Sequence, residues 1–495
     1  MADLQFYAIL FTLLSTLCAW YFTRRPKKNP MPSPPSLPVV GNLHQLGKLP
    51  HRSMRELAKK HGSLMLLHLG SIPTIVVSSP AAAREIFKTN DVVFLDKPAF
   101  SAPRKLFYDL KDPIHMKYGE LWRKLRGIFV QELLSSSRVR AFGTIREEEV
   151  MLLMDRLRES CRSGSPINLS HTFVVWAYDL ISRAAFGKKY SETTEGKKFV
   201  EKIDEVMGIL FNFTIGEFVP WLAWINNLNG FNAALDRYAK EKDEILDAVI
   251  EYHLNGDDRP SRGENFVDIL LDIYKGKNPG LSIDLISVKG VIIDIFGAGS
   301  DTSSITLTWA MTELIRHPSV MKKLQDEVRD VMKGEQHISD EKLQKMPYLK
   351  AVIKETLRLH PPIPIYFRCS RQHVNLMGYE VEPNAPVLIN AWALGRDPSC
   401  WNDPEEFIPE RFSNSSVDFK GFDFCLLPFG AGRRMCPGLA FAVISIEHTL
   451  ANFMQKFDWA LPDGARGEEV SVEEKPGMTV GKKDPLVVVA TKCYF

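Results

Sequence analysis

The chain has 495 residues, of which 45% are hydrophobic, and a formal net charge of +2. The length allows two or three domains and the composition supports a large core, whereas the near-neutral charge gives no whole-chain basis for nucleic-acid binding. Seven cysteines are dispersed without C-x-x-C spacing, which argues against a disulfide framework and a zinc site and indicates a reducing compartment.

The amino terminus has the pattern of a membrane anchor. Residues 6–22 form an uncharged, strongly apolar run that ends in aromatic residues, and its length is near the lower limit for a helix that crosses a bilayer. A basic cluster follows at residues 24–28, so the body of the protein is expected on the cytosolic side. A cleaved secretory signal is the alternative, but its positive charges would precede the apolar run. We therefore predict an uncleaved anchor over residues 1–23 and a basic, proline-rich hinge over residues 24–38.

The remaining chain, residues 39–495, reads mainly as helix. No Gly-rich turn within a βαβ unit indicates a dinucleotide-binding domain, so we predict one mainly α body with small sheets. The expected helices are 53–61, 81–89, 120–129, long segments between 199 and 255 broken by an aromatic region at 211–224, 281–317 ending at Pro318, two within 337–359, and one from 438 to about 453. The expected strands are 64–69, 74–78, proline-rich strand-like chain between 359 and 438, and short strands within 475–490.

The most specific pattern is the segment Phe429–Gly438, which reads Phe-Gly-Ala-Gly-Arg-Arg-Met-Cys-Pro-Gly. The thiolate of Cys436 is a suitable ligand for haem iron. Pro437 suits the first position of a helix, whose N-terminus would favour the anion, and Arg434 can reach a carboxylate such as a haem propionate. A structural buried cysteine is the alternative, and it would be preferred for a lone cysteine. Here the aromatic, glycine and arginine residues all stand at fixed offsets, which favours the ligand.

A second pattern, Gly-Ala-Gly-Ser-Asp-Thr-Ser, lies at residues 297–303 inside the long predicted helix. The hydroxyl of Thr302 is expected to bond back to the carbonyl of Ala298 and leave a donor facing a pocket, and Asp301 is an acid able to relay protons. Each mid-helix glycine costs about 1 kcal/mol relative to alanine, so we expect the glycines to let a flat ligand press against the backbone. An ordinary small-residue packing patch is the alternative.

Together these patterns resemble the cytochrome P-450 superfamily over almost the whole chain. The segment 429–438 is similar to its haem-binding loop and 297–303 to its oxygen-activation motif, and segments 389–398 and 404–412 have the form found in plant microsomal members of specialised metabolism. The resemblance implies the P-450 fold, mainly α with a long central helix over the haem and small β-sheets. It also implies a monooxygenase that binds haem b, uses O2, and receives NADPH-derived electrons from a membrane-bound flavoprotein reductase.

The resemblance further assigns roles to individual residues. Asp301 and Thr302 would deliver protons, and Cys436 would bind iron. The segment 365–369 departs from the family pattern, because it lacks the usual proline and acid and is shorter. The other implied haem contacts are Arg434, Trp122, Arg126, Arg368, Phe429 and Gly438. The implied buried structural triad is Glu355, Arg358 and Arg411, although a Glu-x-x-Arg pair taken alone is more commonly an exposed ion pair.

The implied substrate pocket is apolar, which suggests a compact hydrophobic plant metabolite: a terpenoid, a coumarin or other phenylpropanoid, or an alkaloid. Its residues would be Phe100, Phe107, Phe211, Phe296, Ala298, Ile365, Tyr366 and Met478, each of which is equally well explained as core. A haem-thiolate isomerase or dehydratase, which needs neither O2 nor reductase, is one alternative function, but family members of that type typically lose the alcohol that Thr302 keeps. A non-catalytic haem-binding protein is another. The expected location is the endoplasmic reticulum membrane, single-pass, with the catalytic domain facing the cytosol.

Overall fold

The computed structural model describes residues 30–189, 191–192, 194–210, 214–255, 265–278 and 280–493, together with residues 5, 12 and 15. The predicted anchor and the start of the predicted hinge therefore lie almost wholly outside the described residues. Among the residues that are described, no single helix is both long and apolar enough to cross a membrane.

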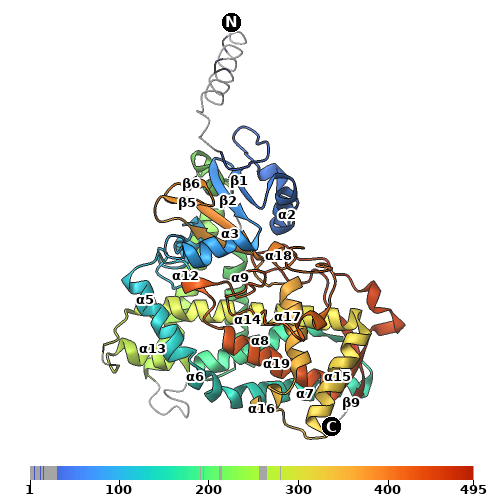
Figure 1. Ribbon diagram of the computed structural model, residues 1–495. Coiled ribbons are helices and arrows are strands. Elements are labelled where there is room, and N and C mark those ends of the chain that lie inside the picture. Colours follow the sequence, from blue (N-terminus) through green and yellow to red (C-terminus); the bar gives the residue numbers. More distant parts are fainter. Residues whose placement is uncertain are drawn as a thin grey trace.

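The molecule is built around one long helix, α14 (Leu285–Arg316), which is buried along most of its length. The side chain of Asp284 caps its start, four residues after the predicted one, by accepting the amide of Ser287 at 2.8 Å. Pro318 begins the next helix, so the predicted end is confirmed. Figure 1 shows α14 crossing the helical part of the molecule, and α8 (Leu169–Phe186) packs along it. The central helix is therefore held in place by its surroundings and can position the side chains of a site.

Most of the predicted helices are present, with boundaries that shift by a few residues. The predicted helices over 81–89 and 120–129 each continue into a π-helical turn, at Glu85–Thr89 and Ile128–Leu133. The remaining α-helices are α2 (Pro50–His61), α3 (Pro80–Arg84), α4 (Ser101–Leu106), α5 (Glu120–Gly127), α6 (Ser136–Ala141), α7 (Gly143–Ser163), α9 (Thr194–Leu210), α10 (Ile215–Phe218), α11 (Ile225–Leu228), α12 (Phe231–Asn255), α13 (Phe266–Tyr274), α15 (Pro318–Met332), α16 (Asp340–Leu343), α17 (Pro347–Leu359), α18 (Ala391–Leu394) and α19 (Leu439–Lys456).

The strands form three small sheets. A four-stranded sheet has the order β1 (Leu64–Leu69), β2 (Ile72–Val77), β7 (Pro386–Asn390) and β4 (Ile365–Cys369), in which only β2 and β7 are parallel. It stands above the helices in Figure 1, beside α2. The other two sheets are β3 (Ile167–Asn168), β9 (Val487–Cys493) and β8 (Phe457–Ala460), and the pair β5 (Val374–Leu376) and β6 (Tyr379–Val381).

The carboxyl-terminal part differs from the sequence prediction. The strands expected within 475–490 reduce to β9, which begins only at Val487, and the preceding residues form turns. Strand β8, directly after α19, was not predicted. Its alternating burial depends on pairing with β9, and such a distant pairing leaves little trace in so short a segment.

The cysteine prediction needs a correction. Cys400 and Cys425 form a disulfide with their Cα atoms 6.3 Å apart, although the dispersed cysteines argued against disulfides. The loop between α18 and α19 brings the two residues together, and sequence spacing alone carries no information about such an approach. Cys369 and Cys436 are free.

A buried ion-pair cluster joins α17 to the loop that leads toward Cys436. Arg358 Nε and Nη2 donate to the two carboxylate oxygens of Glu355 at 2.7 and 2.8 Å, and Arg411 Nε donates to Glu355 Oε1 at 2.9 Å. The side chains of Glu355 and Arg358 are 0% exposed. Arg358 also donates to three backbone carbonyls within residues 395–406. The buried triad is therefore present and the exposed-pair alternative is excluded.

Candidate active site

The cysteine loop is a tight backbone structure that needs its glycines. Gly430 and Gly432 have φ of +70° and +69°, a region that disfavours residues with a Cβ. A Cβ on Gly432 would also lie 2.3 Å from a carboxylate oxygen of Asp91. The amide of Cys436 donates to the carbonyl of Phe429 at 3.0 Å and closes the loop. The segment Phe429–Gly438 thus holds the thiol of Cys436 in a defined position.

The backbone that follows the cysteine points its amides at the sulfur. Helix α19 begins at Leu439 with Gly438 as its N-cap, so Pro437 precedes the helix and does not occupy its first position, contrary to the prediction. The two-residue turn brings the N–H groups of Gly438 and Leu439 to the sulfur. Burial raises the pKa of Cys436, whereas the Gly438 amide, the Arg126 charge and the Leu439 amide lower it. The pKa of Cys436 is raised overall because burial outweighs the amides and Arg126, so these groups only partly stabilise a thiolate, and a bound metal cation would supply the remaining stabilisation.

Helix α5 supports the loop from one side. Trp122 and Arg126 share a face, as their spacing predicts. Arg126 Nη2 donates to the carbonyl of Met435 at 2.6 Å, next to the cysteine. The indole N–H of Trp122 donates to the carbonyl of Pro113 at 3.1 Å, and the guanidinium of Arg434 lies 4.7 Å from the centre of its ring. Both residues therefore hold the loop and its arginine in place.

Three cations converge in a buried region beside the loop. Burial lowers the pKa of Lys97 to about 7, with further lowering by Arg368 and Arg434. Burial lowers the pKa of Arg368 to about 10, and burial and Arg368 lower that of Arg434 to about 9. The Nε atom of Arg434 is buried and has no hydrogen-bond partner among the described residues. The carboxylates of Asp91, Asp96 and Asp112 offset these charges in part, and the Nε atom of Arg434 leaves a buried donor for a further anionic group.

Lys97 was not predicted from the sequence. It stands in a coil between Asp96 and Pro98, and no spacing relates it to Arg368 or Arg434. Arg368, which stands in the segment that departs from the family pattern, is nevertheless in this cluster.

The central helix opens one face to the site. Thr302 Oγ1 donates to the carbonyl of Ala298 at 2.8 Å, as predicted. Because this bond uses the only hydroxyl hydrogen, Thr302 presents an acceptor rather than the expected donor. Ala298 is exposed and Asp301 and Thr302 are half-buried, in a helix that is otherwise buried on both sides. A Cβ on Gly299 would lie 2.7 Å from Ile181, so this glycine serves helix packing and does not make room for a ligand.

The backbone of Ile114 connects the central helix to the cysteine loop by two hydrogen bonds. The amide of Ile114 donates to Asp294 on α14 at 3.0 Å, and its carbonyl accepts from Arg434 at 3.3 Å. Cys436 itself is accessible, although burial dominates its pKa.

Comparisons with known proteins agree with this geometry. A family model described as cytochrome P450 matches residues 31–488. The chain belongs to the cytochrome P450 family. It is a cytochrome P450 monooxygenase of the plant type, so the predicted superfamily and enzyme class are confirmed.

Plant relatives are similar over nearly the full length of this P450. Cytochrome P450 736A117 of Prunus mume is 48% identical over 98% of this chain and 95% of its own. Norfluorocurarine oxidase of a Strychnos species is 47% identical over 93% of each chain, and tabersonine/lochnericine 19-hydroxylase of Catharanthus roseus is 43% identical over 95% of this chain and 94% of its own. A zebra fish cytochrome P450 with abiraterone matches with a TM-score of 0.76 at 24% identity, over 91% of this chain and 100% of that one. This likeness confirms the P450 fold.

The residues present fit the haem that this family binds. A free thiol at Cys436 receives two backbone amides, and Lys97, Arg368 and Arg434 form a cation cluster suited to two propionate carboxylates. The exposed face of α14 around Ala298 is free of bulky side chains. Cys436 thus suits the iron, the cation cluster suits the propionate edge, and the face around Ala298 suits the flat face of a haem.

The predicted substrate residues separate into two groups. Phe100, Ile365 and Met478 are half-buried and Ala298 is exposed, so these remain candidates for the pocket. Phe211 lies outside the described residues. Phe107 and Phe296 belong to the core, and Tyr366 is half-buried.

Two aromatic residues of the predicted pocket are packed in the core, and the third, Tyr366, bonds to the cysteine-loop side. Phe107 stacks on a histidine ring at 4.9 Å, and Phe296 is fully buried between two aromatic rings at 5.5 and 5.6 Å. Tyr366 donates its hydroxyl to the carbonyl of Leu427 at 2.7 Å, on the cysteine-loop side. Side chains alternate along a strand, so Tyr366 shares the face of Arg368, whereas Ile365 points the other way.

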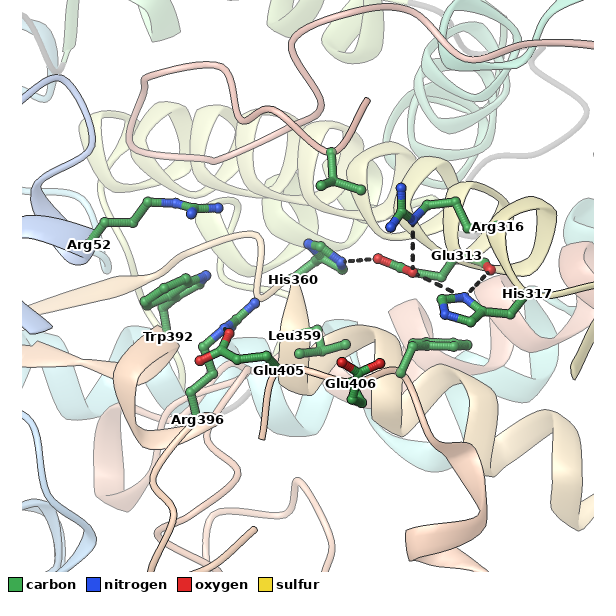
Figure 2. Close-up of a pocket in the computed structure, with 12 residues that line it drawn as sticks. Arg52, Glu313, Arg316, His317, Leu359, His360, Trp392, Arg396, Glu405 and Glu406 are labelled. Carbon is green, nitrogen blue, oxygen red and sulfur yellow. Dashed lines mark hydrogen bonds and ion pairs between the residues drawn. The ribbon is translucent and has the colours of Figure 1, made fainter. Parts of the chain in front are cut away.

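A separate cavity of about 270 Å³ is strongly charged (Figure 2). Glu313 lies at its centre and accepts from the ring of His360 at 2.7 Å, with His317 at 3.4 Å. Three arginines line it as well. Neither Cys436 nor Thr302 is among its lining residues, and its charged walls are unsuited to an apolar substrate. It is therefore distinct from the candidate active site.

Proposed function

We propose that this P450 oxidises a hydrophobic plant specialised metabolite, namely a terpenoid, a coumarin or other phenylpropanoid, or an alkaloid, and that a flavoprotein reductase passes it electrons from NADPH. The observation that carries the proposal is the combination of an amide-supported free thiol at Cys436 with an acid and an alcohol on the open face of α14. Two relatives are named for the oxidation of norfluorocurarine and the hydroxylation of tabersonine or lochnericine, which supports this choice of substrate class.

Individual residues of this chain would bind the haem, hold its propionates and transfer protons. Haem bound through Cys436 supplies an iron centre at which O2 is reduced and split. Lys97, Arg368 and Arg434 would hold its propionates. Asp301 would take a proton from solvent at its carboxylate, and Thr302 would accept a proton at Oγ1 while releasing its own toward the site. The apolar walls would exclude water, so that protons arrive only by this route.

An isomerase or dehydratase would not need this proton route. The alcohol of Thr302 is present and its hydroxyl is held by Ala298 at 2.8 Å, which favours oxygen chemistry over that alternative. A non-catalytic haem-binding protein would have no use for Asp301 and Thr302 on an open face.

We also propose that residues 1–23 anchor the protein in the endoplasmic reticulum membrane as a single span, with the catalytic domain in the cytosol. The support is the apolar run at residues 6–22 followed by the basic cluster at 24–28. Protease protection on microsomes tests it: protease added outside should digest the body while leaving the anchor protected. Protection of the whole body would contradict it.

A pair of cysteine variants tests the function. Cys436→Ser should abolish the carbon monoxide spectrum of a thiolate-bound haem, whereas Cys369→Ser, which removes the other free cysteine among the described residues, a buried one, should retain it. NADPH- and reductase-dependent incorporation of one atom of isotopically labelled O2 into a terpenoid, coumarin or alkaloid would then support the activity. Product formation without O2 or reductase would favour the isomerase.

A further inference from the structure

The turn formed by Lys475–Gly481 is fixed against the central helix. The amide of Lys475 donates to the carbonyl of Gly481 at 2.8 Å, and the amide of Val480 donates to the carbonyl of Pro362 at 2.8 Å. The indole of Trp309, on α14, donates to the carbonyl of Val480 at 3.3 Å. This turn is therefore a well-supported wall of the site and not a loose surface loop.

One side chain of this turn contacts the acid of the site. The hydroxyl of Thr479 donates to carboxylate oxygen Oδ2 of Asp301. Thr479 is half-buried, so water competes only partly for this bond. Burial raises the pKa of Asp301, while the Thr479 hydroxyl and the charge of Lys475, on the same turn, lower it. The turn therefore supplies both a hydrogen bond and the neighbouring charge that favour the carboxylate.

The same turn reaches the substrate side. Met478, which precedes Thr479, is half-buried and is one of the candidate pocket residues. Side chains of adjacent residues in one turn move together when the backbone moves. Met478 and Thr479 are adjacent on this fixed backbone, so the residue that borders the pocket is joined directly to the one that bonds Asp301.

We propose that Thr479 is a positioning residue for proton delivery, which orients the carboxylate of Asp301 by hydrogen bonding and links that orientation to occupancy of the pocket at Met478. The inference rests on the proposed function, because it gives Asp301 its proton-transfer role. In the step concerned, the carboxyl group of Asp301 gives its proton to Thr302 Oγ1, one proton leaves Thr302 toward the site, and the carboxylate takes up a replacement proton from solvent, so protons balance without another reactant. Thr479 itself neither gains nor loses a proton overall.

The test compares three threonine variants in the haem-loaded protein. Thr479→Val removes the hydroxyl, Thr479→Ser restores it, and Thr308→Val is the matched control, because the Thr308 hydroxyl donates to the carbonyl of Ser304 within α14 at 2.8 Å. The first readout is the infrared carbonyl band of protonated Asp301, assigned by its loss in Asp301→Asn and titrated in the ferric protein without NADPH or reductase. This readout needs no turnover.

We expect Thr479→Val to move the titration of Asp301 upward by about one to two pH units, since a hydrogen bond to the charged form is lost. The Ser and Thr308→Val variants should titrate as the wild type. Lys475→Gln, on an exposed side chain, should shift the band in the same direction and provides a second test if Thr479→Val folds poorly. Addition of a ligand that binds the pocket should shift the wild-type band but not that of Thr479→Val.

The second readout is the fraction of NADPH electrons that appear in product rather than peroxide. Thr479→Val should lower this fraction several-fold, with the acid limb of its pH profile moved upward as in the infrared titration, and Ser should recover both. A wild-type titration in Thr479→Val, or an equal shift in Thr308→Val, would overturn the inference. If the wild type shows no NADPH-dependent oxygenation, the proposed function fails instead, while the infrared titration still reports the contact.

Discussion

The buried ion-pair cluster allows a quantitative prediction. Glu355 accepts four hydrogen bonds, two from Arg358 and one each from Arg411 and the amide of Ile408, at 2.7–2.9 Å. Glu355→Gln keeps the shape but removes the charge and faces an amide N–H toward the guanidinium. Hydrogen bonds to charged groups contribute about 1.5–3 kcal/mol each. The loss is smaller than the sum of the four bonds, because Arg358 keeps its hydrogen bonds to three backbone carbonyls. The expected loss is therefore that of a broken buried pair, about 3–5 kcal/mol.

Urea unfolding of the haem-loaded protein, followed by circular dichroism and by haem absorbance, measures this loss. The matched control is Glu469→Gln, because Glu469 lies 3.5 Å from Arg466 with 57% of its side chain exposed, and removing such a surface pair costs at most about 1 kcal/mol. Glu355→Gln should also lose haem earlier in the titration, because the triad holds the loop that precedes Cys436. An equal loss in the two variants, with equal haem retention, would refute the reasoning.

The remaining predictions concern protons and haem. Thr302→Ala should keep haem but divert reducing equivalents to peroxide, measured as product formed per NADPH; unchanged coupling would contradict the proton-relay role. Lys97 has its pKa lowered to about 7 by burial and by Arg368 and Arg434, and propionate binding would raise it again. Haem binding should therefore take up a proton above about pH 7, so that this contribution to affinity falls as pH rises. Lys97→Met should remove that part of the pH dependence in a haem-binding titration, and an unaltered profile would argue against a propionate contact.

Local patterns were sufficient to predict the elements whose residues are close in sequence. The apolar run and Pro318 predict α14 and its end, although its start at Leu285 lies four residues after the predicted one, and the glycines with Cys436 predict a tight loop before a helix. The bond from Thr302 to Ala298 spans a single helical turn. In each case the interacting groups lie within a few residues of one another, so their geometry follows from helix or turn geometry alone.

Contacts between distant segments were not predictable in the same way. Lys97 joins Arg368 and Arg434, and Thr479 meets Asp301, because tertiary packing brings separate loops together. The contact of Tyr366 with the cysteine-loop side was not predictable from the sequence, since the register of β4 against β7 decides which face of the strand meets that loop. The triad was expected only through family resemblance, because the Glu-x-x-Arg spacing does not reveal burial.

The central claim is that the sulfur of Cys436 binds the iron of a haem. X-ray absorption at the iron edge of the purified, haem-loaded protein tests it most directly. We predict one sulfur ligand in the wild type and in Cys369→Ser, and none in Cys436→Ser. A wild-type protein without an iron–sulfur bond, or a sulfur ligand that persists in Cys436→Ser, would contradict the account.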